Sequence, residues 1–141
     1  MSSSKYKSIV QGCVLYNLLT ELWVHGITGF LNPILTISLL LLYTTYFLML
    51  EDLIIRYKLR DIHVFVIGVI FGLWHETFTT GNNLKADGIF GLDPFVLVVA
   101  NVFWWGIIQT VMAQYFCNRI FAPRDVNHNK MGRIGWGLCF F

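Results

Sequence analysis

Charge is scarce in this chain. Only 13% of its 141 residues are charged, whereas a soluble domain carries about 25%. This shortage excludes an ordinary soluble globular domain. The few basic residues form no aromatic-interleaved basic surface, so no nucleic-acid partner is expected. The three cysteines, Cys13, Cys117 and Cys139, stand far apart without a CxxC pair, so neither a disulfide framework nor a zinc site at typical spacing is expected.

Long apolar stretches take the place of the missing charge, and hydrophobic residues make up 56% of the chain. An apolar helix of about 20 residues can cross the hydrocarbon core of a bilayer. We therefore predict an all-α, polytopic integral membrane helix bundle with four complete transmembrane helices and a truncated fifth. The predicted spans cover residues 8–30, 33–50, 62–80 and 94–116, and the fifth starts at about residue 134.

Two Asx-Pro pairs mark the beginnings of the second and fourth spans, Asn32-Pro33 and Asp93-Pro94. Asparagine and aspartate are good N-caps, and proline is tolerated in the first helical turn. We expect Asp61 to cap the third span in the same way. The spans are therefore bounded by recognisable signals as well as by hydropathy.

The basic residues are distributed unevenly between the predicted loops. With the N-terminus inside, nine of the ten Lys and Arg residues lie in inner segments, and only Lys85 lies in an outer loop. Such a bias is typical of membrane proteins whose basic loops face the cytoplasm. We predict a protein integral to the membrane with a cytoplasmic N-terminus. In a prokaryote this would be the cytoplasmic membrane.

The chain ends in an apolar run, IGWGLCFF, which begins at Ile134. Such a short run cannot cross a hydrocarbon core about 30 Å thick. We expect residues 1–141 to form a single transmembrane domain, and we expect this domain to be the N-terminal fragment of a longer protein.

A weak internal repeat divides the chain into two helix pairs. A Leu-Trp pair, a nearby histidine, a Thr-Gly pair and an Asx-Pro pair occur in this order twice, first from Leu22 and again from Leu73. Parallel repeats of this kind occur in some transporters. The matched residues are few, so chance similarity remains the alternative.

The polar residues of the first span form a stripe. Cys13, Asn17, Glu21 and His25 recur every four residues, which places them on one face of a helix. Glu21 and His25 are therefore close enough to pair.

A second acid with a histidine beside it stands near the outer end of the third span. His25 and Glu76 both lie about 7 Å below the outer ends of their helices, at about 1.5 Å of rise per residue. Together with Glu21 and His75 they are predicted to share one layer in the outer third of the membrane. Because ionisable groups are costly inside a bilayer, they favour function.

Other residues are expected to surround this layer. Asn17, Trp74 and Asn101 are candidates for binding a substrate, because they lie at or near its depth. Gly68 and Gly72 share a face with the acid of the third span and follow the GxxxG pattern, which allows a second helix to approach closely.

The chemistry of the layer leaves three hypotheses. Glu21, His25, His75 and Glu76 suit general acid–base catalysis, so the preferred hypothesis is a membrane-embedded enzyme that acts on a lipid-like substrate. A proton- or cation-coupled transporter or channel subunit is the alternative, and a structural membrane subunit without chemistry is the second alternative. Two carboxylates and two imidazoles also suit a divalent metal such as zinc, but the spacing is not diagnostic, so no metal is predicted.

The partners predicted from the sequence are the lipid bilayer and a lipid-like small molecule or ion. The sequence indicates neither a cofactor nor an oligomeric state. If the layer is functional, Glu76→Gln is expected to keep the fold and abolish activity, because an amide fills the same volume but cannot exchange a proton.

Overall fold

A computed structural model describes residues 2–89 and 91–120 of the chain. The described residues form two compact units, one built from residues 2–59 and 113–120 and the other from residues 60–112. The predicted start of a fifth span at residue 134 lies outside the described residues. Unit 1 and unit 2 are described separately.

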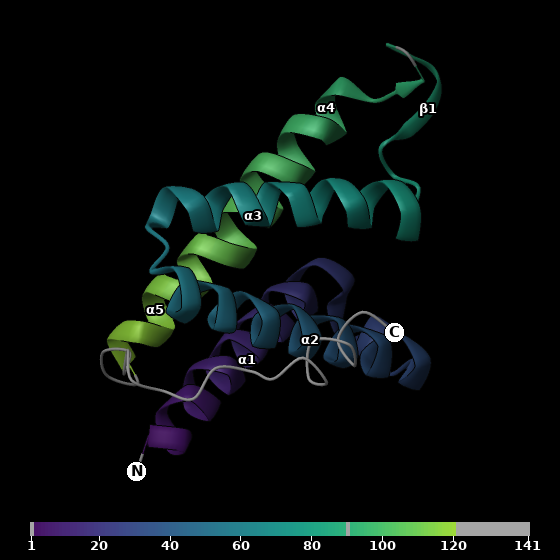
Figure 1. Cartoon of the computed structure of the whole chain (residues 1–141). Helices are drawn as coiled ribbons and strands as arrows, with labels where there is room; N and C mark the ends of the chain where they lie inside the picture. The colour runs from purple at the N-terminus through teal and green to yellow at the C-terminus, as the bar shows by residue number, and fades with distance from the viewer. Residues whose placement is uncertain (1, 90, 121–141) are drawn as a thin grey trace. The chain divides into compact units, whose positions relative to one another are not determined.

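Unit 1 is a helical hairpin with a third, short helix against it. Helices α1 (Ser2–Phe30) and α2 (Pro33–Tyr57) are joined by a tight turn, and α5 (Ala113–Ile120) packs on α1 (Figure 1). Asn32 begins α2 as predicted: its side-chain oxygen accepts hydrogen bonds from the backbone of Ile34 at 3.0 Å and of Leu35 at 3.4 Å. The Asx-Pro signal is therefore confirmed here.

One glycine interrupts α1 near its C-terminal end. Gly26 has φ 67° and ψ 176°, so the helix is broken one residue beyond His25. L-residues rarely adopt this φ, whereas glycine does so at little cost. The break separates the last turn, up to Phe30, from the long helical segment that carries the polar stripe.

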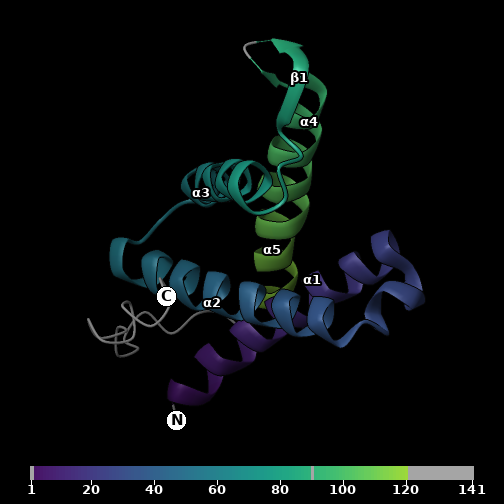
Figure 2. The ribbon, with the colours of Figure 1, turned by 90° about the vertical axis from the view of Figure 1, so that its right-hand side faces the viewer.

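Unit 2 is built from two crossing helical segments and a short strand. Helix α3 (Asp61–Trp74) continues into the π-helical η1 (His75–Thr79), and α4 (Pro94–Val96) continues into the π-helical η2 (Leu97–Met112). The segment α3 lies across η2, and strand β1 (Leu84–Ile89) extends beyond α4 (Figures 1 and 2). Among residues 2–89 and 91–120, the only extended structure is β1 and Leu92, which forms antiparallel bridges with Leu84 and Ile89.

The caps of unit 2 match the prediction at one helix and not at the other. Asp93 caps α4 through its side-chain oxygen, which accepts from Phe95 N at 2.9 Å. The prediction for Asp61 is wrong, because Arg60 is the N-cap of α3 and Asp61 is its first helical residue. The ring nitrogen Nδ1 of His63 accepts from Arg60 N at 3.1 Å and so takes the place of an acidic cap.

Glycines allow α3 and η2 to pack closely. A Cβ atom on Gly68 would lie 2.6 Å from Thr110 Oγ1, and one on Gly72 would lie 2.6 Å from Trp105 Cβ. No larger residue fits at these contacts without movement of the neighbour. The close approach expected at the Gly68–Gly72 face is therefore present.

Three helices within the described residues are long and apolar enough to cross a membrane. They are Pro33–Tyr57, Asp61–Thr79 and Pro94–Ile120. Helix α1, the predicted first span, forms over its expected length but is not among the three, because its stripe of polar residues lowers its hydropathy. The all-helical membrane character is confirmed, and the count of four spans and a truncated fifth is not.

Candidate functional site

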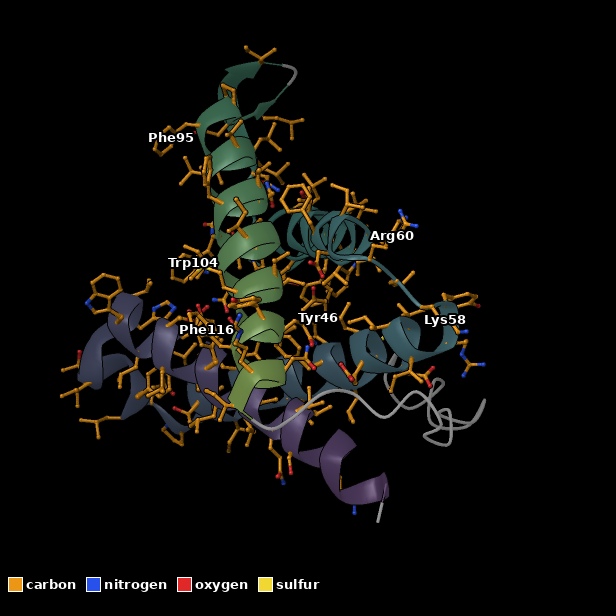
Figure 3. All side chains as sticks on the ribbon, turned by 90° about the vertical axis from the view of Figure 1, so that its left-hand side faces the viewer. Tyr46, Lys58, Arg60, Phe95, Trp104 and Phe116 are labelled. Atoms are coloured by element: carbon orange, nitrogen blue, oxygen red, sulfur yellow. The ribbon has the colours of Figure 1, made fainter. Side chains whose placement is uncertain are left out.

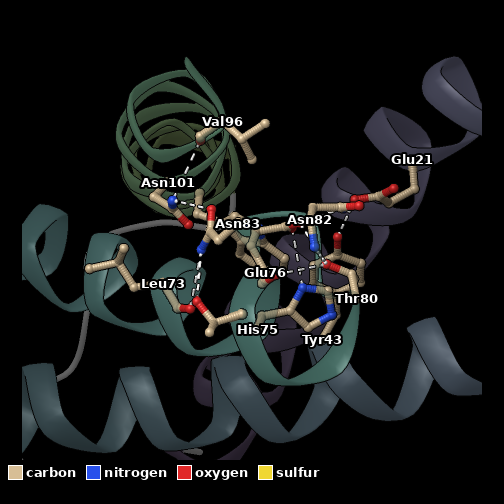
Figure 4. Close-up of polar contacts among 12 residues, drawn as sticks. Glu21, Tyr43, Leu73, His75, Glu76, Thr80, Asn82, Asn83, Val96 and Asn101 are labelled. Carbon is tan, nitrogen blue, oxygen red and sulfur yellow. Dashed lines mark hydrogen bonds and ion pairs between the residues drawn. The ribbon is translucent and has the colours of Figure 1, made fainter. Parts of the chain in front are cut away.

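In unit 1, Glu21 is the centre of a three-residue polar chain. Its carboxylate is buried and accepts a hydrogen bond at Oε1 from the hydroxyl of Tyr43 on α2. Its other oxygen, Oε2, pairs with Nε2 of His25 at 3.2 Å, as the four-residue spacing predicts. Figure 4 shows the contact between the two helices. The hydroxyl, the carboxylate and the imidazole thus form a continuous hydrogen-bonded chain.

The imidazole of His25 lies at the exposed end of this chain, with 43% of its side chain accessible. Its sequence neighbours Trp23, Val24 and Ile27 are large, apolar and exposed. In a bilayer, such a surface faces hydrocarbon. The polar chain therefore runs from the buried Tyr43 to a histidine that stands among apolar side chains.

The polar stripe continues inward from Glu21 through fully buried residues. Asn17 donates from Nδ2 to the backbone oxygen of Cys13 at 2.8 Å. Its other side-chain atom, Oδ1, has no hydrogen-bond partner among the described residues. The thiol of Cys13 is in turn directed at the backbone oxygen of Ala113 on α5, at 3.7 Å.

In unit 2, Glu76 is held by four side-chain donors (Figure 4). Trp105 Nε1 donates to Oε1 at 2.8 Å, and the same oxygen lies 3.3 Å from Nδ1 of His75. At Oε2, Asn82 donates at 2.7 Å and Thr80 at 2.9 Å. Both carboxylate oxygens are therefore engaged, and they join η1, η2 and the loop after η1.

The π-helical geometry of η1 coincides with this site. The backbone of Thr80 donates to His75 O at 3.1 Å, a bond between residues five apart in sequence. Short π-helical segments occur frequently at functional sites. Here the wider turn accompanies the return of the Thr80 hydroxyl onto the carboxylate of Glu76.

Asn101 belongs to a neighbouring polar contact and not to the shell of Glu76. Its Nδ2 donates to Oδ1 of Asn83 at 3.0 Å, and Asn83 donates to Thr77 Oγ1 at 2.9 Å. Asn83 and Asn101 are both fully buried. The amide of Asn101 therefore fixes the loop to η2. Trp74 is exposed, and its ring is tilted against that of Phe71 with ring centres 5.9 Å apart.

Of the predicted layer, the structure brings together two pairs, each within one unit. Glu21 lies beside His25 in unit 1, and Glu76 lies beside His75 in unit 2. The layer that would unite all four remains a prediction. Within neither unit do three or more described His, Cys, Asp or Glu side chains gather in a way that could hold a metal ion.

Sequence reasoning missed the aromatic donors, Tyr43 and Trp105. A signal for the first was present, because Glu21 and Tyr43 both lie eleven residues from Asn32 at the turn and so meet across a hairpin. The sequence gives no comparable signal for Trp105. A loop separates it from Glu76, and residue spacing does not determine the path of that loop.

Two further acids, Glu51 and Asp52, lie just beyond the predicted end of the second span and are buried. Asp52 is 2% exposed and pairs with Arg56 at 3.0 Å, whereas Glu51 is 1% exposed. Their position at the predicted end of a span concealed this burial, because α2 continues to Tyr57 and packs there as well.

The two units resemble each other in two respects. In each, a glutamate on the first helix accepts a hydrogen bond from an aromatic side chain of the second, which is Tyr43 in unit 1 and Trp105 in unit 2. In each, the second helix begins with a capping Asx-Pro pair. The repeat itself stays a prediction, because aligning Leu22 with Leu73 places Glu76 opposite His25 and not opposite Glu21.

Comparison with known proteins places the chain in a family. No curated protein and no solved structure matches it significantly. A family model described as an uncharacterized membrane protein family matches residues 12–135, which covers most of the chain. Together with three helices that can span a bilayer, this match establishes membrane character. The chain belongs to this uncharacterized membrane protein family.

Proposed function

We propose that this membrane protein is an enzyme that performs acid–base chemistry on a lipid-like substrate, with His25 and Glu21 at its reacting centre. The observation that carries the proposal is the partly exposed imidazole of His25 among exposed apolar side chains. A charged or polar group at such a surface is costly unless it serves a purpose. A substrate dissolved in the bilayer would reach this histidine laterally.

The hydrogen-bonded chain suits a histidine that moves a proton. Imidazole has two ring nitrogens, and a partner on one of them leaves the other for a reacting group. Glu21 holds Nε2 at 3.2 Å, so Nδ1 is the atom that would meet the substrate. The carboxylate would orient the ring and stabilise the imidazolium that forms when His25 accepts a proton. Tyr43 fixes the carboxylate from the buried side.

Glu76 and His75 take a supporting role in this proposal. The four donors around Glu76 engage both of its oxygens, so no oxygen is left over for a substrate proton. Such charge-assisted hydrogen bonds are among the stronger ones in proteins. We assign this pair to holding the loop after η1. The roles of Asn17, Asn101 and Trp74 in binding a substrate stay predictions.

The proposal includes the finer topology. Helix α1 is the first of four complete spans. The N-terminus is cytoplasmic, which places His25 near the outer surface. The polar stripe of α1 is then tolerated in the membrane because α2 and α5 cover most of it.

The test compares the lipids of host membranes that contain the wild-type protein, Glu21→Gln, His25→Phe or the control His63→Phe. We expect the wild type and His63→Phe to change the same lipid species, measured by mass spectrometry, and the other two variants to leave that species unchanged. His63 is a matched control because it is an exposed histidine at the start of α3. Identical lipid profiles for wild type and folded Glu21→Gln would refute the proposal.

A further inference from the structure

The buried polar stripe of unit 1 reaches a second acid at its inner end. The hairpin register that pairs Glu21 with Tyr43 also brings Glu51 level with Cys13, since both lie nineteen residues from Asn32. Cys117 on α5 agrees with this register, because its thiol interacts electrostatically with both Cys13 and Glu51. Two buried carboxylates thus stand at the two ends of one stripe inside unit 1.

Asn17 lies between these two acids. The separation from Cys13 to Glu21 is about 12 Å along α1, at about 1.5 Å per residue, and Asn17 stands at its midpoint. Its side chain is 0% exposed, and its Oδ1 lacks a hydrogen-bond partner among the described residues. Buried carbonyl oxygens are normally satisfied by protein or by water. An unpaired amide oxygen midway between two acids is suited to hold a water molecule.

We infer that unit 1 contains a proton path that connects Glu51 with Glu21 by way of a short chain of waters held at Asn17. A proton that reaches the carboxylate of Glu51 passes to the first water, each water releases one of its own protons to the next, and the last water protonates Glu21. Only O–H bonds break and form, and one proton leaves the path for each that enters. Tyr43 and His25 continue the path from Glu21 towards the outer surface.

The proposed path depends on the proposed function only at its outer end, where it would supply protons that the reaction at His25 consumes. It goes beyond that function because proton passage needs no lipid substrate. A purely structural stripe would show the same burial but no passage of protons. A proton path and a structural stripe therefore differ in proton flux across the membrane, which can be measured.

The test uses the full chain reconstituted in phospholipid vesicles that contain a pH-sensitive dye. A potassium gradient with valinomycin sets a membrane potential, and the rate of the internal pH change reports proton entry. We expect the wild type to exceed protein-free vesicles several-fold. Asn17→Leu and Glu51→Gln should return the rate to that of protein-free vesicles. Gln11→Leu, an exposed polar residue of the same helix, should keep the wild-type rate.

A further variant separates a lost path from a lost fold. Asn17→Ser keeps a group that can donate and accept, so it should retain at least half of the flux. Thermal unfolding followed by tryptophan fluorescence identifies any variant that fails to fold. Wild-type flux at the level of protein-free vesicles, or full flux in folded Asn17→Leu, would overturn the path. Lipid chemistry that persists without flux counts against the path alone, whereas flux without lipid chemistry counts against the proposed enzyme alone.

Discussion

At the scale of single residues, the hydrogen bonds around Glu76 change the effect on stability that is expected of a substitution at this position. The sequence by itself predicts that Glu76→Gln keeps the fold. In the structure, two donors converge on each carboxylate oxygen. A glutamine has one oxygen, and its NH₂ group would face two of these donors without being able to accept from them. An unsatisfied buried donor costs about 1–3 kcal/mol.

We therefore expect Glu76→Gln to lower the free energy of unfolding by about 2 kcal/mol, because it removes the charge that the four donors share and leaves two of them without an acceptor. Thr80→Val, which removes a single donor and leaves the acceptor in place, should cost about 1 kcal/mol. Both changes in the free energy of unfolding are to be measured by reversible unfolding in mixed detergent micelles. Equal stability of wild type and Glu76→Gln would show that the four contacts do not hold the loop.

At the scale of elements, the packing of α3 on η2 depends on two glycines that face Trp105 and Thr110. The same tryptophan donates to Glu76, so helix packing and the polar site are linked through one side chain. A change that displaces the indole would loosen both. Through Trp105, the close packing at Gly72 therefore affects the position of Glu76, which lies one helical turn further along the chain.

Gly72→Ala tests this link. Its Cβ would lie 2.6 Å from Trp105 Cβ, and overpacking of this kind costs about 1–3 kcal/mol. We expect a loss of stability in that range together with a shift in tryptophan fluorescence as the indole moves. Ile70→Ala is the control, because Ile70 is 60% exposed on the same helix and should change neither. An alanine at position 72 without effect on either measurement would argue against the close contact.

At the scale of the whole molecule, orientation in the membrane is the property most open to direct measurement. The connection between α2 and α3 carries Lys58 and Arg60, whose side chains are exposed and extend away from the ribbon (Figure 3). Basic residues that flank spans in this way favour the cytoplasmic side. The connection between α3 and α4, which contains β1, is then outside.

Cysteine labelling tests this orientation in a background without the native cysteines. Ile89→Cys in β1 should react with a membrane-impermeant maleimide added outside, whereas Tyr57→Cys at the end of α2 should react only after the membrane is opened. The two positions are matched, because each is 64% exposed. Asn83 in the same outer loop is unsuitable, because it is fully buried. The reverse labelling pattern would invert the topology.

The sequence alone determined the features that depend on neighbours along the chain. The caps at Asn32 and Asp93 and the pairing of Glu21 with His25 could be predicted, because they involve residues no more than four apart. The membrane character followed from composition, since hydropathy sums over many residues. Only Asp61 was misjudged among the local signals, because Arg60 is the N-cap of α3 and the ring of His63 accepts from its backbone N–H.

The tertiary structure decided which groups complete each acid. Tyr43 reaches Glu21 from the neighbouring helix, and Trp105 reaches Glu76 from 29 residues away. The burial of Glu51 likewise required a packed partner beyond the predicted end of the span. Periodicity along one helix shows which side chains share a face. It does not show which helix covers that face, because the choice depends on side-chain shape and close packing between segments that are distant in sequence.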